Sequence, residues 1–167
     1  MDFLNELHPQ AVRIAELLRA RDEKIAVADG ATGGLIGAAL LTVPGALEFY
    51  VGGGIVYSFR ARDVLFNLPR EAYAGMRSVT EEYAILQAGA IRDQMGAQWG
   101  IAESGSAGSS KHPLGVASGR SITAVTGPQD FQITRLVETD SDDRIDNMAA
   151  FTRNALNLLE EALIRVG

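Results

Sequence analysis

The sequence has no cysteine and little positive charge. Without cysteine, disulfides, thiolate catalysis and Cys-based zinc sites are excluded. Lys and Arg total 15 against 21 Asp and Glu, a net charge of −6 at pH 7. This balance argues against an electrostatic nucleic-acid-binding protein, although it leaves room for a local basic pocket.

Long hydrophobic runs are also missing. The longest apolar stretch, 35–47, is interrupted by Thr42 and Pro44 and is too short to cross a bilayer. The N-terminal ten residues do not combine a basic segment with an apolar run. We therefore expect a cytoplasmic protein without a membrane partner.

What the chain does have fits one globular domain over residues 1–167. Hydrophobic residues make up 47% and charged residues 22%, which excludes wholesale disorder. Glycine is abundant, with 18 residues, and much of it is clustered. These clusters carry the functional hypotheses below.

Hydrophobic periodicity and turn residues predict an alternation of helices and strands. The expected helices cover 9–20, 35–41, 60–66, 80–95 and 142–165, with Pro9 near the start of the first. The expected strands cover 24–28, 52–57, 99–102, 116–125 and 131–137, the last two as an antiparallel hairpin. This order predicts a three-layer α/β/α domain with a mixed, mostly parallel sheet of about five or six strands.

Two glycine-rich loops should follow strands, where open α/β sheets bind ligands. The first, A-D-G-A-T-G-G at 28–34, could offer backbone N–H groups and a helix N-terminus to an anion. Its alternative is a tight turn whose glycines serve packing. The second, E-S-G-S-A-G-S-S at 103–110, suits a carboxamide, sugar or phosphate, or is a plain surface loop.

Four motifs occur in a characteristic order: A-D-G-A-T-G-G, G-G-G-I-V-Y-S, S-G-S-A-G and H-P-L-G-V. Over about 14–164 the chain resembles the CinA C-terminal domain family. That family includes bacterial nicotinamide mononucleotide amidohydrolases of pyridine-nucleotide salvage. The resemblance implies a nucleotide-sized ligand site between the two glycine-rich loops, no cofactor, and a homodimer.

The departures from the family pattern affect catalysis. The resemblance places Gly30 where the family has its proposed serine nucleophile, Ala31 at a cysteine and Asp29 at a glutamate. It places Arg62 at a lysine thought to assist the nucleophile. Gly30 has no side chain to attack an amide, and Arg62 stays protonated and cannot act as a base. Arg62 could still bind phosphate, or simply pair with Asp63 as a surface charge.

The expected ligand site follows from these loops and the resemblance. We expect its anion contacts to be the backbone amides from Thr32 to Gly34, with Arg62 as the cation and Arg144 as a second candidate. Restoring serine and lysine, by Gly30→Ser with Arg62→Lys, is expected to give weak turnover if the pocket is otherwise intact. The expected ligand-binding residues are Gly30, Ala31, Thr32, Gly33, Gly34, Tyr57, Arg62, Ser104, Gly105, Ser106, Ala107, Gly108 and Arg144.

Other nucleophiles deserve consideration. Thr32 is one, but a helix N-cap is its simpler role. Ser106 could pair with His112, and Ser104 is a further candidate, although a nearby histidine in a serine-rich loop is commonplace. The acids at 138–146 include no histidine and lack EF-hand spacing, so we expect no metal site and read them as a solvated turn before a helix.

Three hypotheses remain open. The chain could be a family relative that does not deamidate but binds a nucleotide or small phosphorylated ligand. It could be a hydrolase that uses another nucleophile or an activated water. It could instead be a non-catalytic interaction protein. The retained glycines favour the first hypothesis over the third, and the missing serine argues against the second.

Overall fold

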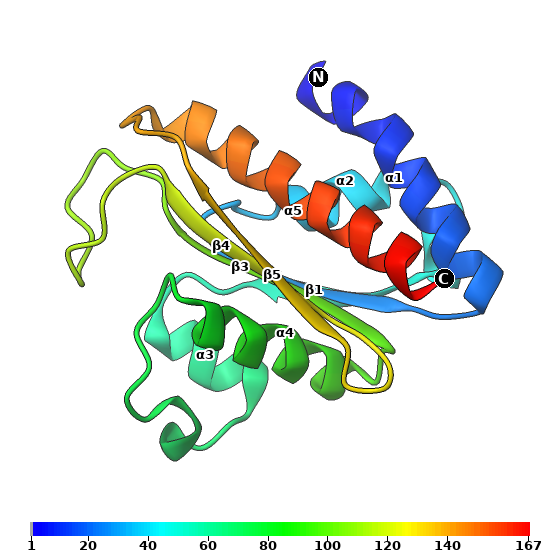
Figure 1. Cartoon of the computed structure of the whole chain (residues 1–167), viewed down its shortest axis with the longest axis horizontal. Helices are drawn as coiled ribbons and strands as arrows, with labels where there is room; N and C mark the ends of the chain where they lie inside the picture. Colours follow the sequence, from blue (N-terminus) through cyan, green and yellow to red (C-terminus); the bar gives the residue numbers. More distant parts are fainter. Residues whose placement is uncertain (1) are drawn as a thin grey trace.

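The computed structural model describes residues 2–167 and contains one mixed five-stranded sheet. Figure 1 shows how this sheet and the helices are arranged. Its strands are β1 (Ile25–Asp29), β2 (Tyr50–Ile55), β3 (Trp99–Ser106), β4 (Arg120–Thr126) and β5 (Gln132–Glu138), in the order β2-β1-β3-β4-β5. β1 pairs in parallel with β2 and β3, whereas β4 is antiparallel to both of its neighbours. The parallel strands thus end together at one edge of the sheet.

Helices cover both faces of the sheet, as Figure 1 shows. The helices α1 (Asp2–Arg21), α2 (Leu35–Leu41) and α5 (Arg144–Val166) pack together on one face. The helices α3 (Phe59–Phe66) and α4 (Glu81–Met95) lie on the other, and two short 3₁₀ helices span Ala46–Glu48 and Arg70–Tyr73. The predicted three-layer α/β/α fold is confirmed.

Each face of the sheet has its own apolar core. Trp99 and Ile101 of β3 point toward the α1, α2 and α5 layer, where they join Leu159 of α5. Ala102 points to the other face and meets Ala88 of α4. Successive side chains of β3 point to opposite faces of the sheet, so this central strand packs against both helical layers.

The predicted start of the first helix was wrong. α1 begins at Asp2, and Pro9 lies inside it rather than near its start. Pro9 cannot donate a helical hydrogen bond, and packing offsets the free-energy cost, because Leu7 and Ala11 on either side are buried in the core. Propensity alone does not decide a helix boundary when a buried face continues across it.

The predicted end of the third strand and start of the fourth were also wrong, and both affect the site. Residues 103–106 were expected to lie in a loop, but β3 continues through Ser106, which pairs with Arg120 at the start of β4. The strand predicted from 116 starts only at Arg120. Backbone hydrogen bonds to β4 thus hold the first half of the serine-rich segment in the sheet. The loop 107–119 then links the two strands.

Candidate functional site

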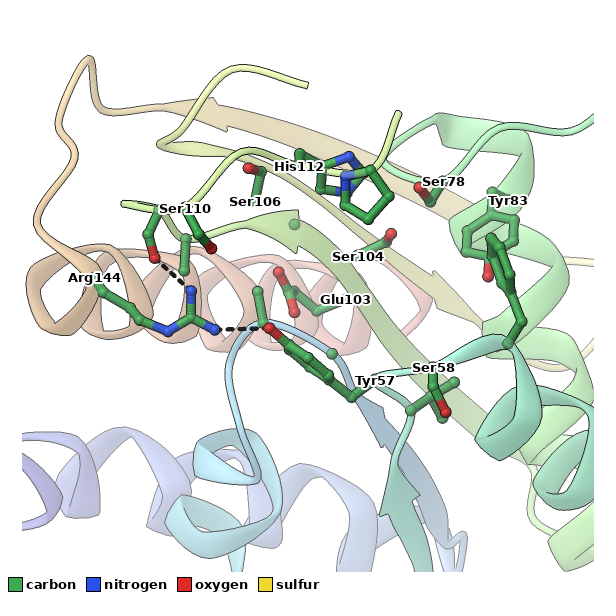
Figure 2. A pocket seen from close by; sticks show the side chains of 18 of the residues that line it. Tyr57, Ser58, Ser78, Tyr83, Glu103, Ser104, Ser106, Ser110, His112 and Arg144 are labelled. Atoms are coloured by element: carbon green, nitrogen blue, oxygen red, sulfur yellow. Dashed lines mark hydrogen bonds between the residues drawn. The ribbon is translucent and has the colours of Figure 1, made fainter. Parts of the chain in front are cut away.

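A pocket of about 420 Å³ lies at the carboxyl ends of the three parallel strands (Figure 2). One wall comes from the residues after β1 and β2, and the other from the end of β3 and the loop 107–119. α4 and the start of α5 complete it. The lining residues that carry polar side chains are Tyr57, Ser58, Ser78, Tyr83, Gln87, Glu103, Ser104, Ser106, Ser110, Lys111, His112 and Arg144.

The structure brings most of the expected ligand residues to this pocket. Those that line it are Gly30, Ala31, Tyr57, Ser104, Gly105, Ser106, Ala107, Gly108 and Arg144. Thr32, Gly33, Gly34 and Arg62 do not line it. The reasons for these absences lie in the hydrogen bonds of the first glycine-rich loop and in the packing of α3.

Asp29, the last residue of β1, holds the start of α2. Its buried carboxylate accepts the Thr32 hydroxyl at 2.5 Å and the N–H groups of Ile36 at 3.0 Å and Gly37 at 3.2 Å. Burial raises the pKa of Asp29, although these hydrogen bonds oppose the shift. Thr32 is neither the helix N-cap nor a free nucleophile, because the cap is Gly34 and the Thr32 hydroxyl is committed to Asp29.

Two of the three expected anion-binding amides are occupied by the protein itself. The Thr32 N–H donates to Oε1 of Glu103 at 3.0 Å, and the Gly33 N–H donates to the Gly30 carbonyl at 3.0 Å. An external phosphate would have to displace these partners. The Thr32 and Gly33 amides thus donate to acceptors within the protein, and neither residue lines the pocket.

Gly30 has no room for a side chain. A Cβ built on it would lie 2.3 Å from the Glu103 carbonyl oxygen and 3.0 Å from Glu103 Oε1. Real Cβ atoms do not approach backbone this closely. The position that the family resemblance assigns to a nucleophile is thus packed against β3.

Glu103 lines the pocket but is absent from the site residues expected from the sequence. It is 1% exposed, and its Oε2 accepts the Ser121 hydroxyl at 2.6 Å. Burial raises its pKa from 4.5 to about 7, with nearby Asp29 adding to the effect. The available signal was a single acid among small and apolar residues in W-G-I-A-E-S-G-S, a pattern that indicates a buried carboxyl once the segment is read as a strand.

The serine and histidine candidates do not form a catalytic pair. The Ser106 hydroxyl donates to the Val116 carbonyl at 3.4 Å, while His112 Nδ1 accepts the Leu114 N–H at 3.1 Å. The Ser104 hydroxyl accepts the Val79 N–H at 2.9 Å. Each of these side chains lines the pocket but bonds to backbone. Desolvation lowers the pKa of His112.

Arg62 lies on α3 outside the pocket. Its guanidinium sits 3.7 Å from the centre of the Tyr73 ring and 4.7 Å from that of Phe59. It also pairs with Asp63 at 3.3 Å, the pairing considered from the sequence. These contacts hold the Arg62 side chain among aromatic rings, and Arg62 is not one of the residues that line the pocket.

Arg144 occupies the rim of the pocket at the start of α5. Its guanidinium donates to the Gly108 carbonyl and, at 2.9 Å, to the Tyr57 hydroxyl, as the dashed lines in Figure 2 show. Lys111 is a second exposed cation on the lining. The rim therefore carries positive charge, while the buried acid lies deeper.

Asn147 fastens the loop beside this rim. Its buried side-chain amide donates to the Ala107 and Ser141 carbonyls, each at 2.8 Å, and its oxygen accepts the Thr139 hydroxyl at 2.5 Å. The nearby Asp143 caps α5 by accepting the Asp146 N–H at 2.9 Å. The acids before α5 thus include a helix cap, as expected from their position.

Metal-ligand clusters and membrane-spanning helices are absent from residues 2–167. No group of three or more His, Asp or Glu side chains within that range could hold a metal ion. None of the helices formed by those residues is long and apolar enough to cross a bilayer.

Comparison with known proteins agrees with this architecture. The family model of the CinA C-terminal domain matches residues 7–163. The chain belongs to the CinA C-terminal domain family. Among its relatives, a CinA-like protein of Anaeromyxobacter sp. (strain K) is 33% identical over 146 residues, covering 87% of this chain and 35% of the relative. One from Chloroherpeton thalassium is 32% identical over 160 residues, covering 93% and 37%.

Solved CinA structures share the fold over nearly the whole chain. A CinA superfamily protein from Klebsiella pneumoniae superimposes with a TM-score of 0.85 at 26% identity, covering 95% of this chain and 98% of that one. The competence or damage-inducible protein from Enterobacter asburiae gives 0.85 at 27% identity, with 94% and 98% coverage. By contrast, the chain spans only about a quarter to about a third of the curated CinA-like proteins it matches.

Proposed function

We propose that this CinA-family chain binds a small phosphorylated ligand, such as a pyridine mononucleotide, and does not deamidate it through a serine nucleophile. The observation that carries the proposal is the contrast between position 30 and the rest of the pocket. Gly30 is packed too closely against Glu103 to carry any side chain. Around it, a cavity of about 420 Å³ stays open, large enough for a small ligand.

The rim supplies the anion-binding chemistry. Arg144 is exposed, projects from the first residue of α5 and lines the pocket with Lys111. A guanidinium suits phosphate because it offers several N–H donors in a fixed plane. Arg144 therefore takes the role that the sequence suggested first for Arg62.

The neutral part of the lining suits the rest of a nucleotide. Tyr83 and Gln87 of α4 are nearly buried and lie on the wall contributed by that helix. The Gln87 carboxamide makes no side-chain hydrogen bond to any protein group among residues 2–167. An aromatic ring and a free carboxamide match a heterocyclic base or a sugar.

Calorimetric titration with nicotinamide mononucleotide and with its riboside tests the proposal. We expect wild type to prefer the phosphorylated ligand, and Arg144→Ala to weaken it about tenfold to a hundredfold, the worth of a charge-assisted hydrogen bond. The affinity for the riboside, which has no phosphate, should fall much less in Arg144→Ala. Arg62→Ala is the matched control, since that arginine lies outside the pocket.

A parallel assay follows ammonia release from nicotinamide mononucleotide. We expect none above the background of protein-free buffer, because no nucleophile stands at position 30. Robust release by wild type would overturn the proposal in favour of a hydrolase with another nucleophile or an activated water. Failure of all pyridine nucleotides to bind would favour an interaction protein instead. A homodimer remains our proposal for the assembly, to be checked by sedimentation.

A further inference from the structure

The charged groups of the pocket are separated by depth. Arg144 and Lys111 are exposed at the rim, whereas Glu103 is 1% exposed at the floor. Glu103 is the single acid among the lining residues of the described chain. In the view of Figure 2 its carboxylate lies amid the labelled residues, between Ser104 and the Tyr57–Arg144 pair. The pocket thus presents opposite charges at its two ends.

The fold leaves Glu103 without a counter-charge. Its carboxylate accepts hydrogen bonds from the Thr32 N–H and the Ser121 hydroxyl, both neutral donors. Over residues 2–167 no Lys, Arg or His forms an ion pair with it. A buried carboxylate ordinarily has a cationic partner or gives up its charge. Since each carboxylate oxygen can accept two hydrogen bonds, Glu103 also keeps unused acceptor capacity.

Gly30 and Gly105 make room for this carboxylate. A Cβ at residue 105 would lie 2.5 Å from Glu103 Oε2, and one at residue 30 would lie 3.0 Å from Oε1. Both residues line the pocket. Side chains at either position would crowd the Glu103 carboxyl, so the two glycines leave the space that this carboxyl occupies.

We propose that Glu103 is a ligand-recognition residue, which selects molecules that carry an anionic group at one end and a positively charged or N–H-donating group at the other. The cationic end supplies the counter-charge that the fold omits, while Arg144 takes the anion. This inference rests on the proposed binding of a phosphorylated ligand and adds a second specificity to it.

Two forms of one nucleotide provide the test. Nicotinamide mononucleotide has a positively charged ring, whereas its 1,4-dihydro form has a neutral ring on the same ribose phosphate. We expect wild type to bind the charged-ring form about tenfold or more tightly, the worth of a charge-assisted contact. Glu103→Gln, which keeps an acceptor for the Thr32 N–H, should remove this preference and leave the affinity for the dihydro form within about twofold of wild type.

The controls separate recognition from folding and from the proposed function. Glu16→Gln removes one charge from an exposed position on α1 and should leave the preference unchanged. Equal affinity of wild type for both forms would overturn the role of Glu103 while leaving phosphate binding intact, and this outcome needs no variant. An equal loss of both forms in Glu103→Gln would mean that Glu103 only supports the loop. Absence of binding by either form would refute the proposed function and the inference with it.

Discussion

The backbone of Gly30 packs directly against the carbonyl group of Glu103. Gly30 directly follows β1, and Glu103 belongs to β3, which is the parallel neighbour of β1 in the sheet. A Cβ at residue 30 would come within 2.3 Å of the Glu103 oxygen. The same Cβ would lie 3.0 Å from Oε1 of Glu103, so a side chain at residue 30 would also crowd the buried acid on the adjacent strand.

Replacing Gly30 by serine should destabilise the protein rather than restore catalysis. We expect Gly30→Ser, alone or with Arg62→Lys, to lower the free energy of unfolding by about 1–3 kcal/mol through overpacking, with no ammonia release from nicotinamide mononucleotide. This replaces the expectation of weak turnover formed from the sequence. Gly89→Ser is the control, because a Cβ on that α4 residue meets nothing within 4 Å. Measurable deamidation by the double variant would contradict the prediction.

Stability should fall as pH rises through the range in which Glu103 ionises. Its pKa is about 7 in the folded protein against 4.5 for the ordinary group, so the folded state holds a proton that the unfolded chain has lost. Between about pH 4.5 and 7 the free energy of unfolding should decrease by about 3 kcal/mol from this group alone. Urea unfolding of wild type and Glu103→Gln at pH 5 and 7.5 measures this change in the free energy of unfolding. If the free energy of both proteins changed with pH in parallel, the raised pKa of Glu103 would be contradicted.

Asn147 should be among the most sensitive polar positions. Asn147→Ala removes three hydrogen bonds and leaves the Ala107 and Ser141 carbonyls without this donor, at a cost of about 3 kcal/mol. Asn154→Ala on the same helix is the control, since its single contact to the Arg135 carbonyl is 3.5 Å long. Thermal unfolding would compare the two, and similar losses would show that the Asn147 network contributes little.

Arg62 should matter for stability and not for ligand affinity. Arg62→Lys replaces a planar guanidinium lying over the Tyr73 ring at 3.7 Å by a compact ammonium, which should cost about 1 kcal/mol of unfolding free energy. Titration of the same variant with nicotinamide mononucleotide should give the wild-type affinity. A tenfold loss of affinity would return Arg62 to the binding site.

Local sequence patterns predicted much of the fold. The apolar run before Pro44 gave α2 its bounds, and the turn-rich segment at 126–130 correctly indicated an antiparallel hairpin. Errors arose where long-range contacts decide the outcome. β3 extends through Ser106 because β4 pairs with it, and no local feature of the glycine and serine residues signals that partner.

The sequence singled out segments that line the pocket, but it did not predict the hydrogen bonds that their residues make. Both glycine-rich segments contribute residues to the lining of the pocket. The hydrogen bond from the Thr32 N–H to Glu103 joins residues 71 positions apart, so only the packed sheet reveals that the loop amides are occupied. The same holds for Arg62, whose aromatic neighbours Phe59 and Tyr73 come together only once α3 packs beside the second 3₁₀ helix.

The carboxylates of Asp29 and Glu103 have a consequence for the energetics of ligand binding. They fix the loop after β1 before any ligand arrives, so this part of the pocket loses little conformational entropy on association. The cost of ordering falls instead on the opposite wall, where residues 109–111 are exposed. One side of the cavity acts as a preorganised template, and the affinity of a ligand depends on how much of the other side it must immobilise.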